Sequence, residues 1–199
     1  DHVFDVPAEG GTPRQLTSGD FNHGGSLSFT PDGAEILFSA NRNEDWELQS
    51  READIFAVGV ATGALRQLTS EPGTETSPKV SPDGKRVAFL KTANTRVPFL
   101  ATNIHVMGLD GTGARNLTEG LDSRAGSAEW LSNSEIAYTF QNRGENFVGA
   151  VTTGGKRRTA AEKIGGTTVG RPYVSGTFDA GKAGAIVYTK GSATRPADL

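Results

Sequence analysis

A repeat with a period near 50 residues restricts the fold of this chain more than any other feature. One short apolar run occurs four times, and its first aliphatic residues, at positions 36, 87, 136 and 186, are 51, 49 and 50 residues apart. A second pattern, "RQLT" at residues 14–17 and 66–69 and "RNLT" at 115–118, gives spacings of 52 and 49, and a degenerate "KRRT" follows at 156–159. Because two independent patterns share one period, the chain contains about four structural repeats.

Each repeat has the composition of short strands separated by turns. Glycine supplies 26 of the 199 residues, about twice its usual share, and many of these glycines lie between short β-branched and aromatic runs. No segment shows a sustained 3.6-residue period. The motif Pro-Asp-Gly at 31–33 and again at 82–84 is typical of a tight turn that joins two strands. The sequence therefore predicts an all-β protein.

A period near 50 with four strands per unit is typical of a β-propeller, in which each blade is a four-stranded antiparallel sheet. We expect first strands at 26–30, 77–81 and 127–131, each followed by the apolar run as second strand. Neighbouring blades would cover both faces of that second strand, which explains why residues 36–38 are continuously apolar.

The chain begins and ends at the same phase of the repeat. Residues 1–199 therefore form one propeller domain with three complete blades, flanked by two trailing strands at 1–17 and two leading strands at about 171–190. Two arrangements follow: the ends pair in a closed four-bladed ring, or the chain is part of a larger propeller. Exchange of the end strands between chains would give a homo-oligomer. Because the first residue is Asp1, we expect the native start to lie elsewhere.

Several of these segments resemble a known family. The pattern "SPDGKRVAF", with "DIFAV" and "RQLT" around it, is similar to the propeller repeat of TolB and of prolyl-oligopeptidase-family serine peptidases. The segments "FSANRNEDWE", "NRGENF" and "SATRPADL" resemble the acylaminoacyl-peptidase branch of that family.

This resemblance implies a noncatalytic propeller that limits access of substrate to a Ser-His-Asp site in an α/β-hydrolase domain outside this chain. The partners would be short peptides and that hydrolase domain. The chain has no Gly-x-Ser-x-Gly nucleophile elbow, so we assign it no catalytic residue, although we expect the whole protein to be a serine peptidase. The alternative is a TolB-like periplasmic interaction propeller.

Candidate substrate-binding residues lie in the two longest connections, 41–52 and 92–102, which both follow a second strand. The resemblance implies that side chains near the domain interface hold the termini of a peptide. Carboxylates would bind a terminal ammonium and guanidinium groups a terminal carboxylate. The candidates are Glu44, Asp45, Trp46, Glu47, Arg51 and Arg96. Asn41-Arg42 recurs as Asn142-Arg143, so we expect Arg42 to pair with an acidic residue of the next blade.

Composition narrows the remaining function classes. The net charge is −3 and the basic residues are scattered, which gives no indication of a nucleic-acid partner. No apolar run approaches the roughly 20 residues of a membrane span. The absence of cysteine fits a reducing compartment, so we expect a cytoplasmic location, with the periplasm as the alternative. No metal-ligand spacing is present, and we expect neither a metal nor a cofactor.

Overall fold

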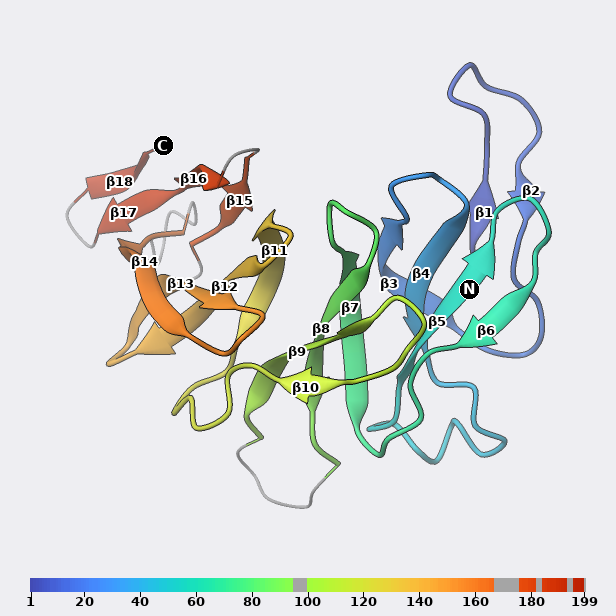
Figure 1. Cartoon of the computed structure of the whole chain (residues 1–199), viewed down its shortest axis with the longest axis horizontal. Coiled ribbons are helices and arrows are strands. Elements are labelled where there is room, and N and C mark those ends of the chain that lie inside the picture. Colours follow the sequence, from blue (N-terminus) through green and yellow to red (C-terminus); the bar gives the residue numbers. More distant parts are fainter. Residues whose placement is uncertain (95–99, 167–175, 182–183, 193–194, 199) are drawn as a thin grey trace. The chain divides into compact units, whose positions relative to one another are not determined.

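The computed structural model describes residues 1–94, 100–166, 176–181, 184–192 and 195–198 (Figure 1). They separate into two compact units, the first made of residues 1–100 and 107–114 and the second of residues 101–106 and 115–199. Described residues in both units form strands and turns, which confirms the predicted all-β class. No helix among them is long and apolar enough to cross a membrane.

Three four-stranded antiparallel sheets dominate the described residues, and we call them blades 1, 2 and 3. Blade 1 is ordered β3(His23–Phe29), β4(Glu35–Ala40), β5(Asp54–Gly59), β6(Leu65–Gln67). Blade 2 is ordered β7(Thr74–Val80), β8(Arg86–Thr92), β9(Thr102–Gly108), β10(Arg115–Asn116). Blade 3 is ordered β11(Gly126–Ser132), β12(Glu135–Asn142), β13(Glu145–Thr152), β14(Arg157–Ile164).

Two-stranded sheets lie before and after these blades in the sequence. The first pairs β1(Phe4–Asp5) with β2(Arg14–Gln15). After blade 3, β15(Phe178–Ala180) pairs with β16(Ile186–Tyr188), and β17(Lys190–Ser192) pairs with β18(Arg195–Asp198). The β1–β2 pair lies within the expected trailing strands at 1–17 and the β15–β16 pair within the expected leading strands at about 171–190, whereas the β17–β18 pair was not predicted.

The core of the first unit shows why a second strand is apolar at successive positions. Ile36 and Phe38 of β4 pack with Val3 and Leu16, which flank β1 and β2. Leu37, from the same strand, lies in a separate cluster that includes residues 87 and 89 of β8. Successive side chains of a strand point to opposite faces, so β4 is buried on both. The second unit has its own cluster around Leu131, Ala137, Val148, Ala150, Ala161 and Ile164.

The "RQLT" pattern has a structural meaning that is the same in three repeats. Its threonine hydroxyl accepts a 2.9 Å hydrogen bond from a backbone N–H of the neighbouring third strand, as in Thr17 to Val3, Thr69 to Ile55 and Thr118 to Ile104. Its arginine donates to a backbone carbonyl of the next repeat: Arg14 to Val60 and Ala61, Arg66 to Leu109, and Arg115 to Thr153. We call these contacts the arginine latches.

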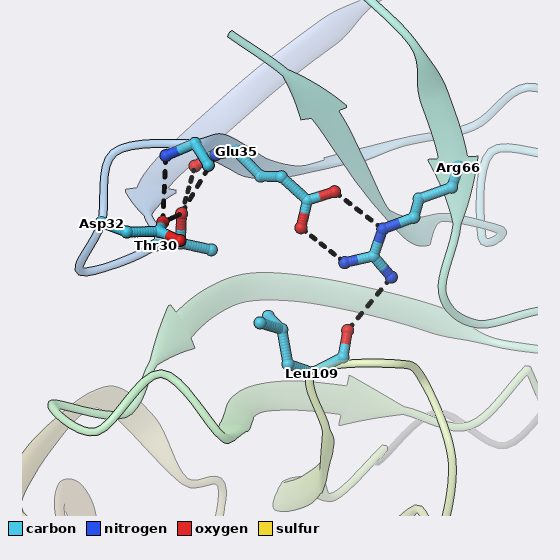
Figure 2. A network of polar contacts seen from close by, with 6 residues as sticks. Thr30, Asp32, Glu35, Arg66 and Leu109 are labelled. Atoms are coloured by element: carbon cyan, nitrogen blue, oxygen red, sulfur yellow. Dashed lines mark hydrogen bonds and ion pairs between the residues drawn. The ribbon is translucent and has the colours of Figure 1, made fainter.

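The Pro-Asp-Gly segments form the expected turns. The Thr30 hydroxyl donates to Asp32 Oδ1 at 2.6 Å and accepts from the backbone N–H of Glu35 at 3.0 Å (Figure 2). Gly33, in the same turn, has φ of +70°. Ser81 and Asp83 repeat this geometry between β7 and β8, also with a 2.6 Å hydroxyl-to-carboxylate bond. The turn is therefore a structural element of the repeat.

Two details differ from the sequence predictions. First strands begin at residues 23, 74 and 126, earlier than expected, because each continues across a bulge that contains a residue with positive φ: Gly25 (86°), Ser77 (55°) and Ser127 (44°). In blade 3, Arg158 lies opposite Ala150 just as Arg66 lies opposite Ala57. The "KRRT" alignment, which placed Lys156 there, is therefore wrong by two residues.

Candidate functional site

The connection between β4 and β5, which we call loop 41–52, is a succession of tight turns. The Asn41 side-chain amide donates to the carbonyls of Trp46 at 3.3 Å and Gln49 at 2.8 Å. Backbone bonds from Leu48 N–H to Asp45 and from Gln49 N–H to Trp46 close successive turns. The loop is thus held by its own first residue.

The far end of the loop is attached to the beginning of β7. Glu52 Oε2 accepts a 2.8 Å hydrogen bond from the backbone N–H of Gly73, and the Thr74 hydroxyl donates to the Arg51 carbonyl at 2.7 Å. Glu52 Oε1 also contacts the side-chain amide of Asn94, which lies in the other long connection, 92–102. The two long connections therefore meet at Glu52.

A surface pocket of about 470 Å³ lies at this meeting point, lined by Leu48, Gln49, Ser50, Arg51, Glu52 and Asn94. Among the predicted substrate-binding residues that the structure describes, Arg51 alone lines it. Glu44, Asp45 and Glu47 are exposed elsewhere on the loop, and Trp46 is half-buried. Arg96 lies outside the described residues.

The sequence prediction missed the other five lining residues. A signal for some of them existed, because the two long connections follow second strands that are one repeat apart. Equivalent loops of adjacent blades lie near each other, so a contact between residues 52 and 94 was deducible. Leu48 carried no such signal, although its side chain is 86% exposed at the pocket.

Two further carboxyl groups, those of Asp54 and Glu75, lie close to Glu52 at the attached end of loop 41–52. Asp54 begins β5, and Glu75 lies in β7 with only 1% of its surface exposed. Glu75 Oε1 lies 2.6 Å from Lys91 Nζ. Burial, followed by the negative charges of Glu75 and Glu52, raises the pKa of Asp54 to about 6. Among the described residues, no group of three or more His, Asp or Glu side chains is arranged to hold a metal ion.

A different environment surrounds Arg42, at the start of the same loop. Its guanidinium lies 4.5 Å from the centre of the Phe21 ring, contacts the imidazole Nε2 of His23, and donates to the Ser18 carbonyl at 3.4 Å. Burial, followed by the Arg42 charge, lowers the pKa of His23 to about 4. The prediction that Arg42 pairs with an acidic residue of the next blade is wrong, because aromatic and imidazole groups surround its charge.

Comparison with known proteins supports the assigned fold. Residues 1–98 match the family model described as the dipeptidyl peptidase IV (DPP IV) N-terminal region. The repeated four-stranded sheets and the similarity to solved TolB structures show a fold of the β-propeller type, and residues 1–98 are similar to that N-terminal region.

Particular relatives are similar at low sequence identity. An uncharacterized protein of Agrobacterium fabrum is 24% identical over 119 residues, which covers 59% of this chain and 35% of that protein. TolB from Acinetobacter baumannii has a TM-score of 0.65 at 20% identity, and the alignment covers 98% of this chain and 44% of the TolB chain. A puromycin-hydrolyzing peptidase of Mycobacterium tuberculosis has a TM-score of 0.62 at 19% identity over 79% of this chain and 27% of its own. The chain thus spans less than half the length of each.

Proposed function

We propose that this chain is the substrate-gating propeller of a serine oligopeptidase of the acylaminoacyl-peptidase type. It would admit short peptides to a Ser-His-Asp site in an α/β-hydrolase domain of the same protein, in the cytoplasm. The observation that carries the proposal is the match of residues 1–98 to the DPP IV N-terminal region. The likeness to the puromycin-hydrolyzing peptidase supports it, because that protein has the same propeller fold.

The pocket supplies a physical basis for contact with a peptide. It combines the guanidinium of Arg51 and the carboxylate of Glu52 with amide groups from Gln49 and Asn94 and the exposed apolar side chain of Leu48. A guanidinium binds a carboxylate through paired hydrogen bonds, and amides bind peptide backbone groups. Arg51 would bind the free carboxyl terminus of a peptide, while the Glu52 carboxylate is already bound to Gly73 and Asn94.

The protein that carries this chain together with a hydrolase domain provides the test. We expect it to cleave a short peptide and to leave the same sequence uncut within a folded protein. A serine-directed fluorophosphonate should label a residue outside positions 1–199, and the chain by itself should not be labelled. Labelling within positions 1–199, or equal cleavage of short and folded substrates, would contradict the proposal.

The second candidate is a TolB-like periplasmic propeller that binds other proteins and has no hydrolase domain. The observation that favours it is the coverage of 98% of this chain by the Acinetobacter baumannii TolB comparison. Cell fractionation separates the two candidates. A periplasmic product with no fluorophosphonate-reactive domain supports the TolB-like function, and a cytoplasmic reactive product supports the gating function.

A further inference from the structure

Asp54 and Glu75 are brought together where blades 1 and 2 adjoin. Ala53 and Thr74 form a parallel bridge. The backbone N–H of Glu75 donates to the Ala53 carbonyl at 2.8 Å, and the N–H of Ala53 donates to the Gly73 carbonyl at 3.1 Å. The residue that follows the bridge on each segment is therefore a carboxylic acid.

Glu75 has one oxygen that lacks a partner. Lys91 neutralises Oε1, but Oε2 is buried and has no hydrogen-bond partner among the described residues. A buried carboxylate oxygen without a donor is unfavourable, because it has lost water and gained nothing in exchange. A second negative charge on the neighbouring acid would add repulsion to this unfavourable setting.

Asp54 is the neighbouring acid, one residue beyond the bridge. It accepts hydrogen bonds from Gln67 at 3.0 Å and Thr69 at 3.5 Å, yet its pKa is raised to about 6. The charged groups that act on the pair are Glu52, from loop 41–52, and Lys91, from β8. Uncharged groups face Asp54 from the adjacent strand β4, where Ala40 lies opposite it. The charges of Glu75 and Glu52 therefore both act on Asp54, while the ammonium of Lys91 lies against Glu75.

We propose that Asp54 is protonated in mildly acidic solution, and that loss of its proton near neutral pH, beside the buried Glu75 and the loop-holding Glu52, loosens the attachment of loop 41–52. With the proton gone, two adjacent negative charges lie beneath Glu52, whose own carboxylate secures the loop to Gly73 and Asn94. Like charges in a partly buried setting repel strongly. This inference goes beyond the proposed function, since it does not depend on what the pocket binds.

The sign of the pH dependence follows from linkage. The folded chain keeps the Asp54 proton up to about pH 6, whereas the unfolded chain releases it near the ordinary value of 3.8. Stability from this proton is therefore fully present below that lower value and is lost as the pH rises through about 6.

Trp46 gives a direct reading of the loop. The chain has two tryptophans, so Trp130→Phe leaves Trp46 as the single indole fluorophore. In that background we expect a change in Trp46 fluorescence centred near pH 6, which Asp54→Asn abolishes because an amide does not titrate. The exposed Asp122→Asn is the matched control and should retain the transition.

A second measurement identifies the titrating group. The ¹³C shift of the Asp54 carboxyl carbon should titrate with the same midpoint, and Glu75→Gln should lower that midpoint by about one pH unit by removing the adjacent charge. If Glu75→Gln fails to fold, the Asp54→Asn comparison decides by itself. The proposal is overturned if wild-type Trp46 shows no transition, or if the transition survives in Asp54→Asn.

Discussion

Arg66 donates two parallel hydrogen bonds to the carboxylate of Glu35, at 2.8 and 2.7 Å (Figure 2). The third position of its guanidinium donates to the Leu109 carbonyl at 3.1 Å. One side chain thus joins β6 to the start of β4 and to the next repeat. The equivalent Arg158 makes the same paired contact with Glu135, and its side chain is more exposed.

This comparison gives the first prediction. Arg66→Ala should lower the free energy of unfolding by about 1–2 kcal/mol, because a charge-assisted pair and a bond to the next repeat are lost and solvent screens part of the effect. Arg158→Ala should cost about half as much or less, since that pair is more exposed. Denaturant unfolding of both variants checks the order, and an equal loss would contradict the role of the Leu109 contact.

Acid should destabilise the chain through His23. The folded state lowers the His23 pKa to about 4 from 6.5, so between these values only the unfolded chain takes up the proton. Stability from neutral His23 is present above 6.5 and is lost as the pH falls toward 4. In His23→Gln, the melting temperature should lose this part of its pH dependence, whereas His105→Gln should keep it. A profile unchanged in His23→Gln would show that another group is responsible.

The turn that contains Gly33 requires positive φ. Gly33 has φ of +70° with open space around it, so an added methyl group meets no atom but forces a left-handed alanine. Gly33→Ala should therefore lower stability by about 1 kcal/mol. Gly24→Ala also enters open space, but at a residue without positive φ, and should be nearly neutral. Equal melting temperatures for the two variants would refute this explanation.

Asn41 should control how readily loop 41–52 is cleaved. Asn41→Ala removes two hydrogen bonds that hold the loop carbonyls of Trp46 and Gln49. Because local opening precedes proteolysis, trypsin should cut after Arg51 several-fold faster, with little change in global stability. Asn43→Ala, which removes a side-chain bond to Gln49, should have a smaller effect. A cleavage rate unchanged in Asn41→Ala would show that other contacts hold the loop.

Different variants can test the three predicted ammonium-binding carboxylates and the pocket independently. Replacing Glu44, Asp45 and Glu47 together by their amides removes three exposed carboxylates that do not line the pocket. If they bind a peptide ammonium, affinity for peptides with a free amino terminus should fall about tenfold, while acetylated peptides are unaffected. Isothermal titration checks this. Arg51→Gln should instead weaken peptides with a free carboxyl terminus.

The repeat period was sufficient to predict the second strands and their burial. Spacing placed Ile36 and Val87 in equivalent strands, and continuous apolar character predicted the two covered faces of β4. The Pro-Asp-Gly turns were equally readable, because proline and glycine restrict the backbone directly. These features depend on local sequence and repetition alone.

Local sequence and repetition did not predict where the first strands begin or which residues line the pocket. Ser77 and Ser127 adopt positive φ, which serine does not signal, so the bulges and the earlier strand starts were missed. The sequence predicted that Arg42 pairs with an acidic residue, but its guanidinium contacts the aromatic ring of Phe21 and the imidazole of His23 instead. Contacts between segments that are distant in the sequence determine the bulges and the partners of Arg42, and a single sequence does not reveal those contacts.

The arginine latches have a direction, because each passes from the fourth strand of one repeat to the following repeat. Each repeat therefore contributes an arginine that donates to the following repeat and a backbone carbonyl that accepts from the preceding one. Duplicating or deleting a whole repeat leaves every remaining arginine with a carbonyl to bind. A change of blade number by whole repeats would therefore preserve the contact between each arginine and the repeat that follows it.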